Sequence, residues 1–97
     1  MMILSANDFS AIKITQFLDE AGKIKSLPSK YHVRLAVLFY LSQKFAIHRN
    51  YTEKEINDLI NQWHVFRDYF ILRREMVDAG FMNREKDGSR YWRPEVK

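Results

Sequence analysis

Cysteine is absent from the 97-residue chain, which excludes disulfides, thiolate nucleophiles and thiolate metal ligands together. A secreted domain of this size usually needs disulfides, so their absence favours the cytosol. The opening Met-Met-Ile-Leu is too short for a signal peptide and has no basic flank before it. The longest apolar run, Leu35 to Leu41, has seven residues, whereas a membrane span needs roughly 20. We therefore expect a soluble cytoplasmic protein without a membrane partner.

Glycine is also scarce, occurring only at positions 22, 80 and 88. This spacing excludes a P-loop and a dinucleotide-binding fingerprint, and no nucleophile elbow or glycine-lined oxyanion loop is present. The histidines at 32, 48 and 64 form no i, i+4 pair that could hold a metal on a helix. We expect no enzymatic activity, no catalytic residue, no cofactor and no metal.

Large aromatic side chains are plentiful, with seven Phe, five Tyr and two Trp in a chain that is 46% hydrophobic. Each of these side chains buries much area, which matters in a chain with room for one modest core. Since no repeat, low-complexity tract or Pro/Gly-rich linker interrupts the sequence, we expect residues 1–97 to form a single domain.

Positive charge is concentrated in the first half of the chain. Residues 1–50 hold seven Lys and Arg against three acids, while residues 51–97 hold nine of each, for a net charge of +4. A basic surplus suggests an anionic partner such as nucleic acid. An ordinary basic surface explains the surplus equally well.

Four segments have helical periodicity. The first runs from about Asp8 to Ala21 with Gly22 after it, and the second runs from near Ser29 to about Phe45. The middle of the second is apolar nearly all round, so it lies either at the centre of the core or in a dimer interface.

The third helix has the clearest start. Thr52 and Glu55 form a capping-box pattern just before an apolar stripe. The fourth covers about Phe66 to Ala79, and Gly80 followed by Phe81 predicts a Schellman ending.

Residues 81–93 are typical of a β-hairpin that turns at Asp87-Gly88, the favoured type I′ pair. This turn predicts a register that pairs Glu85 with Arg90 and Arg84 with Tyr91. Residues 24–27 alternate polar and apolar side chains, so they are a candidate third strand.

The order helix, turn, helix, hairpin predicts a mainly α fold with a small β-hairpin wing. It is a winged helix-turn-helix with an extra N-terminal helix. The core would span about residues 29–93 and the N-terminal helical extension about residues 8–22.

Four ordered motifs resemble the bacterial family called domain of unknown function 2087: Lys23–Lys30, Tyr51–Asn57, Leu72–Gly80 and Asp87–Arg93. The resemblance covers about residues 12–93 and implies a winged-helix-like fold. Some members are joined to transcription-regulator domains, which implies a regulatory role without implying DNA contact. The sequence departs from the family pattern around residues 64–68, where the family has a shorter turn from Trp-His into Asp.

The leading functional hypothesis is a non-enzymatic, DNA-binding or DNA-associated module in transcription regulation, with double-stranded DNA as partner. In helix-turn-helix proteins the recognition helix enters the major groove, and here that helix would expose Arg67, Phe70, Ile71 and Arg74. The candidate DNA-binding residues are Lys30, Arg34, Arg67, Arg74, Lys86 and Arg90. A homodimer would match two half-sites. Against base reading, the helix is neutral overall and has no Asn, Gln, Ser or Thr.

The alternative is a protein–protein interaction module on the same fold, without DNA contact. Its candidate patch is Phe66, Phe70 and Ile71, since exposed apolar clusters often mark interfaces. The apolar second helix and residues 1–4 could also serve a dimer. Any of these aromatic side chains could instead belong to the core.

Overall fold

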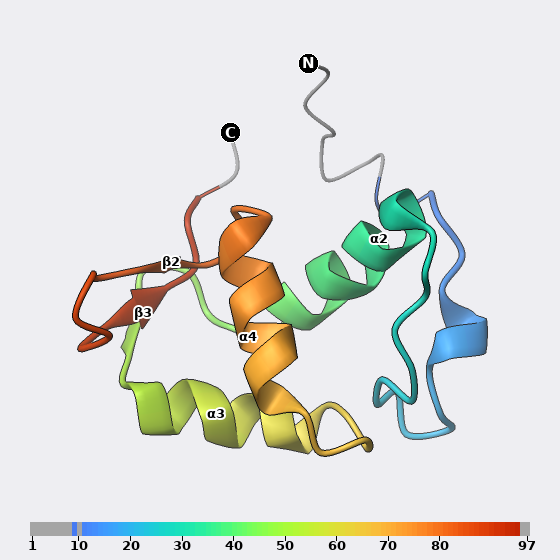
Figure 1. Ribbon diagram of the computed structural model, residues 1–97, viewed down its shortest axis with the longest axis horizontal. Helices are drawn as coiled ribbons and strands as arrows, with labels where there is room; N and C mark the ends of the chain where they lie inside the picture. Colours follow the sequence, from blue (N-terminus) through green and yellow to red (C-terminus); the bar gives the residue numbers. More distant parts are fainter. Residues whose placement is uncertain (1–8, 10, 96–97) are drawn as a thin grey trace.

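A computed structural model describes Phe9 and residues 11–95 of the chain (Figure 1). The elements in chain order are the 3₁₀ turn η1 (Thr15–Phe17), helix α2 (Tyr31–Ser42), strand β1 (Asn50–Tyr51), helices α3 (Glu53–Gln62) and α4 (Tyr69–Asp78), and strands β2 (Asn83–Arg84) and β3 (Tyr91–Trp92).

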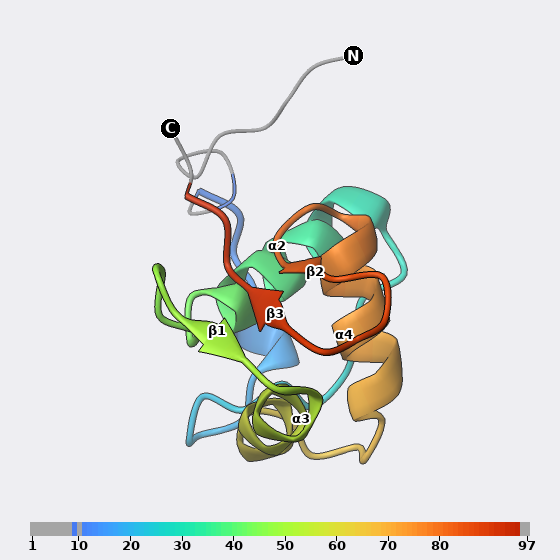
Figure 2. The ribbon, with the colours of Figure 1, turned by 90° about the vertical axis from the view of Figure 1, so that its left-hand side faces the viewer.

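The three short strands form an antiparallel sheet in the order β1-β3-β2 (Figure 2). The predicted hairpin register is confirmed, because Arg84 pairs with Tyr91 and the Glu85 amide donates to the Arg90 carbonyl at 3.0 Å. The sheet therefore joins the hairpin to the segment between α2 and α3.

Residues 24–27 are not the third strand of this sheet. Ile24 makes only isolated bridges, and its amide donates to the Trp63 carbonyl at 2.8 Å while its carbonyl accepts from the Val65 amide at 3.0 Å. Its side chain is fully buried in the core. The segment is therefore bound to the end of α3, and β1 takes the place of the third strand.

The predicted N-terminal helix is wrong over residues 11–21, where the one helical element is the 3₁₀ turn η1; positions 8 and 10 lie outside the described residues. The Asp19 carboxylate accepts from the amides of Ala21 and Lys23, both at 2.9 Å. Such local side-chain bonds compete with a helix. They fold the chain back at Gly22, whose φ is +81°, and the Lys25 amide then donates to Phe17.

Helix α2 lies at the centre of the core, as its nearly uniform apolar middle allowed. Val37 and Leu41 are fully buried and Leu38 is 2% exposed. The helix is shorter than predicted at both ends, because Lys30 is extended (φ −66°, ψ 125°) and Gln43 ends the helix.

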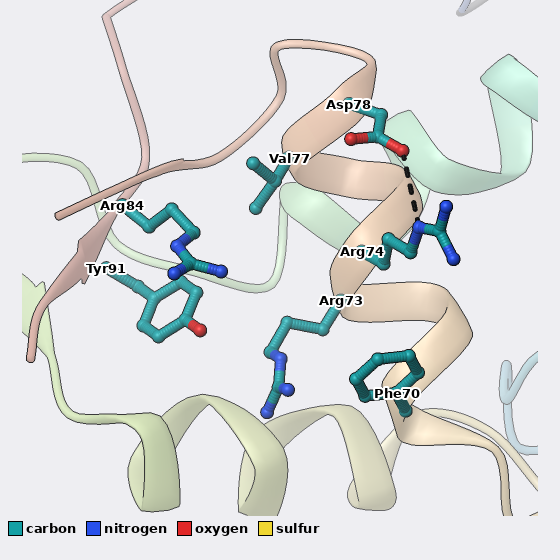
Figure 3. Close-up of a pocket in the computed structure, with 7 residues that line it drawn as sticks. All are labelled: Phe70, Arg73, Arg74, Val77, Asp78, Arg84 and Tyr91. Atoms are coloured by element: carbon teal, nitrogen blue, oxygen red, sulfur yellow. Dashed lines mark ion pairs between the residues drawn. The ribbon is translucent and has the colours of Figure 1, made fainter. Parts of the chain in front are cut away.

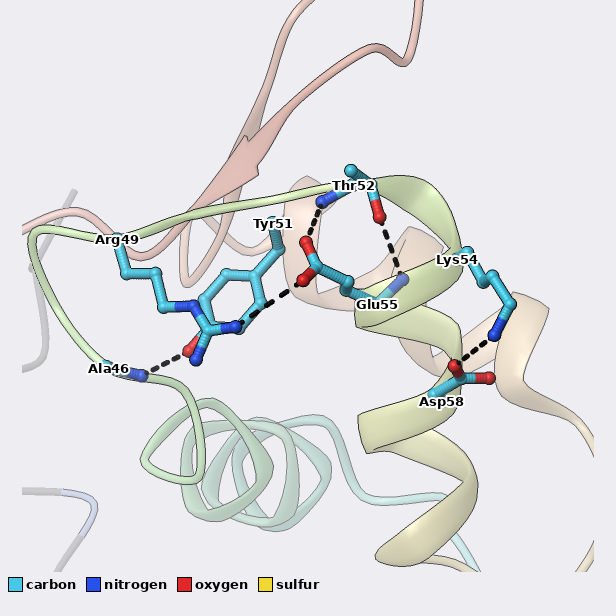
Figure 4. Close-up of polar contacts among 7 residues, drawn as sticks. All are labelled: Ala46, Arg49, Tyr51, Thr52, Lys54, Glu55 and Asp58. Carbon is cyan, nitrogen blue, oxygen red and sulfur yellow. Dashed lines mark hydrogen bonds and ion pairs between the residues drawn. The ribbon is translucent and has the colours of Figure 1, made fainter.

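The predicted start of α3 is confirmed as a reciprocal capping box (Figure 4). The Glu55 amide donates to the Thr52 hydroxyl at 3.1 Å, and the Thr52 amide donates to the Glu55 carboxylate at 2.9 Å. These bonds satisfy two amides that the helix itself leaves unpaired. Tyr51 secures the preceding strand, since its hydroxyl accepts from the Ala46 amide at 2.8 Å.

One hydrophobic core unites the helices and the hairpin. Its buried members include Ile56 and Ile60 from α3, Leu72 and Met76 from α4, and Tyr91 from β3. The result is a mainly α domain with a small β wing, in a winged-helix-like arrangement. Within residues 11–95, no helix is long and apolar enough to cross a membrane.

Candidate nucleic-acid interface

Helix α4 lies between the hairpin on one side and the start of α2 on the other (Figure 1). Leu72 and Met76 are fully buried on its inner face, while Phe70 is 56% exposed on its outer face. Its C-terminus has the predicted Schellman ending, because the Phe81 amide donates to the Met76 carbonyl at 2.9 Å and the Gly80 amide to Val77 at 3.0 Å. The outer face of α4 lies between two segments with basic side chains, the hairpin and the start of α2.

The start of α4 differs from the prediction. The helix begins at Tyr69, with Asp68 as its N-cap accepting from the Ile71 amide at 3.3 Å. The buried His64 ring fixes this start: its Nδ1 lies 2.7 Å from the Ile60 carbonyl, and its Nε2 accepts from the Asp68 amide at 2.9 Å. A carbonyl on one nitrogen and an amide on the other require the neutral Nδ1–H tautomer. The lead-in to α4 is therefore tied to the end of α3.

This lead-in places two of the predicted site residues outside the helix. Arg67 is exposed with φ +56°, a left-handed conformation that few non-glycine residues adopt. Phe66 is partly buried against the core, and its ring contacts His64 edge-to-face at 4.9 Å. Arg67 remains available to a partner, whereas Phe66 is largely committed to packing.

The fourth helix itself presents Arg74 and Phe70. The Arg74 side chain is 70% exposed, and its Nε lies 3.8 Å from an Asp78 carboxylate oxygen, too far for a strong bond. Ile71, predicted to be exposed, is partly buried against the core. The exposed face is therefore narrower than the sequence suggested.

Arg34 and Lys30, the candidates at the start of α2, differ in their availability. Arg34 forms a two-pronged bond with Glu75 of α4, with Nε donating at 2.5 Å, and it also donates to the Pro28 carbonyl at 3.3 Å. Glu75 raises the pKa of this guanidinium. Lys30 is exposed at the N-cap of α2. Arg34 therefore joins α2 to α4, and Lys30 is left as the cation at this edge.

The hairpin carries three exposed cations. Arg90 is paired with Glu85 across the strands, and no ion pair engages Lys86 among the described residues. The third is Arg84, which sequence reasoning placed only in the register. Its guanidinium donates to the carbonyls of Glu85 and Lys86 at 3.1 and 2.9 Å. Only the predicted pairing with Tyr91 indicated from the sequence where Arg84 lies on the hairpin.

The turn is not type I′. That turn needs positive φ at both central residues, and among the described non-glycine residues only His48 and Arg67 have it. The Gly88 amide donates to the Glu85 carbonyl at 3.0 Å, so Lys86 and Asp87 are central. The Asp87 carboxylate accepts from the Ser89 hydroxyl and amide, which lowers its pKa. Its local bonding thus selects the turn.

Arg73 lies behind these residues and joins α4 to α3. Its guanidinium donates to Asn57 at 2.7 Å and lies 3.1 Å from Glu53, and its side chain is only 12% exposed. It also lies 5.9 Å from the Tyr91 ring. Arg73 is thus mainly structural, while its charge remains close to the hairpin.

A shallow cleft of about 300 Å³ separates α4 from the hairpin (Figure 3). Its lining residues are Phe70, Arg73, Arg74, Val77, Asp78, Arg84 and Tyr91. Figure 3 shows the Arg84 guanidinium over the Tyr91 ring and pointing toward α4, while Arg74 extends away from the hairpin toward Asp78. The cleft combines apolar walls with guanidinium groups.

Two of the three histidines are engaged by other groups among the described residues. Over the part of the chain that the structure describes, no group of three His, Asp or Glu side chains could hold a metal ion. His64 is engaged on both ring nitrogens, and His48 is paired with Glu95 at 2.5 Å.

The chain belongs to the family described as an uncharacterized protein conserved in bacteria (DUF2087), whose profile matches residues 23–93. The match confirms the resemblance carried by the four motifs. No curated protein and no solved structure matches the chain.

Proposed function

We propose that this domain is a DNA-binding, transcription-regulatory module that uses α4 and the hairpin as its DNA-facing surface. The observation that carries the proposal is the set of exposed cations around α4. Arg67 lies before the helix, Arg74 on it, Lys86 at the hairpin tip and Lys30 at the start of α2.

Because these cations are spread over α4 and the segments beside it, they suit contact with a DNA duplex. A helix-turn-helix domain places its recognition helix in the major groove, while flanking cations contact the backbone. Here the hairpin lies on one side of α4 and the start of α2 on the other (Figure 1). Its outer face carries Arg74 and Phe70 and no amide side chain, so contact with phosphates is favoured over reading of adenine.

The test is fluorescence anisotropy with a labelled random duplex at about 50 mM salt, where phosphate contacts dominate affinity. We expect Arg67→Ala, Arg74→Ala and Lys86→Ala together to weaken binding at least tenfold. The control is Lys13→Ala, Lys23→Ala and Lys25→Ala, which removes the same charge from the segment on the side away from α4 (Figure 2). Equal loss of affinity in both triple variants would exclude a DNA surface centred on α4.

Phe70 favours a second candidate, a protein-interaction module without DNA contact. Its ring is 56% exposed on the outer face of α4, and exposed aromatic side chains are enriched at interfaces. Phe70→Glu should then abolish a complex while the fold is kept. Ile71→Glu is unsuitable for this test, because Ile71 packs against the core.

A further inference from the structure

The hydroxyl of Tyr91 is the unusual group in the cleft between α4 and the hairpin. Tyr91 is only 2% exposed, and buried tyrosine hydroxyls usually have a hydrogen-bond partner. Among the described residues this hydroxyl makes no hydrogen bond. Every fully enclosed polar side-chain atom there has a hydrogen-bond partner, so the Tyr91 hydroxyl is not fully enclosed. Figure 3 shows this hydroxyl directed toward α4, across the cleft that Tyr91 lines.

Arg84 lies beside that hydroxyl with one edge of its guanidinium fixed. Nε and Nη2 donate to the carbonyls of Glu85 and Lys86, and the guanidinium carbon lies 5.9 Å from the Tyr91 ring centre. Among the described residues Nη1 donates no hydrogen bond, and no carboxylate within residues 11–95 forms an ion pair with Arg84. A guanidinium held in one plane with a free edge is suited to an oxyanion.

The surrounding charges leave this part of the cleft positive. Arg73 lies 5.9 Å from the same ring and is compensated by Glu53 at 3.1 Å. The one carboxylate lining the cleft, Asp78, is nearest to Arg74 at 3.8 Å. Arg84 thus forms no ion pair among the described residues, and the carboxylate that it acts on electrostatically, Asp87, does not line the cleft.

The remaining walls are apolar, with Phe70 and Val77 on the α4 side (Figure 3). The volume of about 300 Å³ is at the lower end for ligand pockets. A small molecule that carries one anionic group and a compact apolar body matches these dimensions.

We propose that the cleft binds a small organic oxyanion, a phosphate or carboxylate held by Arg84 and the Tyr91 hydroxyl, with its apolar body against Phe70 and Val77. The site does not depend on DNA binding. A DNA phosphate has the same chemistry as the anionic group, so the experiment must separate the two sources.

The probe is phenyl phosphate, titrated into the full chain while backbone and arginine side-chain NMR signals are followed. We expect saturable shifts at Phe70, Arg84 and Tyr91, and at least tenfold weaker binding of inorganic phosphate, which lacks the apolar body. Tyr91→Phe and Arg84→Gln should each weaken phenyl phosphate at least fivefold. Tyr91→Phe keeps the buried ring, and Arg84 is exposed, so both variants should fold.

Arg90→Gln is the matched control, because it removes the same charge from the same hairpin but Arg90 does not line the cleft. It should change phenyl phosphate affinity less than twofold. Equal weakening by Arg84→Gln and Arg90→Gln, or shifts spread over the basic surface, would overturn the proposal. Duplex DNA binding that needs Arg84 without any phenyl phosphate binding would also overturn it, while leaving the proposed function intact. Phenyl phosphate binding without DNA binding would support the site and contradict the proposed function.

Discussion

Replacing His64 tests how the start of α4 is held. His64→Ala removes the bond to the Ile60 carbonyl at 2.7 Å and the one from the Asp68 amide at 2.9 Å. Each hydrogen bond contributes about 1 kcal/mol, and a part-buried amide left without a partner adds about 1–3 kcal/mol. The ring is 5% exposed and packs on Phe66. We expect a loss of about 3–5 kcal/mol in the free energy of unfolding, which is large for a single substitution.

The assay is urea denaturation followed by circular dichroism, with His32→Ala as the control. His32 is exposed on α2 and has no hydrogen bond from its ring among the described residues, so its replacement should change stability by less than about 0.5 kcal/mol. Long-range ¹⁵N NMR at neutral pH should find the proton of His64 on Nδ1. Equal stability of the two variants, or a proton on Nε2, would refute this account of how α4 begins.

Four further outcomes follow from the contacts. Thr52→Ala should cost about 1 kcal/mol through loss of the α3 cap, measured by denaturation. The Thr52 amide lowers the pKa of Glu55, so the stabilisation by Glu55 should be complete at neutral pH and lost as pH falls below about 4; comparing Glu55→Ala with wild type across pH tests this. Arg34→Ala should cost about 1.5–3 kcal/mol in the free energy of unfolding, because it breaks a part-buried, two-pronged pair with Glu75. A double-mutant cycle with Glu75→Ala that shows no coupling would contradict this. Leu72→Ala should cost about 2–5 kcal/mol in the free energy of unfolding, because Leu72 is fully buried. Phe70→Ala should cost far less, and equal losses would contradict the assignment of Phe70 to the exposed face of α4.

The features predicted correctly have signals within a few residues. The capping box of α3 and the Schellman ending of α4 are each set by residues at fixed offsets, and both are present. The hairpin register was also predicted correctly, although the central residues of the turn are Lys86 and Asp87 rather than Asp87 and Gly88. Local chemistry of this kind can be read from a single sequence because no distant contact is needed to form it.

The errors arise where a side chain or a distant segment competes with periodicity. Asp19 binds two amides and replaces the predicted first helix with a turn. Helix α4 begins only at Tyr69, because the Asp68 amide before it donates a hydrogen bond to the buried His64 ring. Strand β1 has two residues and exists through pairing with β3, 40 residues further along the chain. None of these has a periodic signal.

The candidate site was predicted in part for the same reason. Arg74, Lys86 and Lys30 are exposed as a surface pattern implies, but nothing in the sequence indicated that Glu75 engages Arg34. The cleft beside Arg84 depends on how the hairpin packs against α4, and that packing is a tertiary property.

The central claim is that α4 and the hairpin face DNA, and the salt dependence of binding tests it most directly. The affinity for a random duplex should be about micromolar at low salt, and its logarithm should fall linearly with the logarithm of salt concentration. In the variant with Arg67, Arg74 and Lys86 replaced by alanine, the magnitude of the slope should fall by about 3, roughly one for each lost phosphate contact. An unchanged slope in this variant, or no binding by the wild-type chain at about 50 mM salt, would contradict the claim.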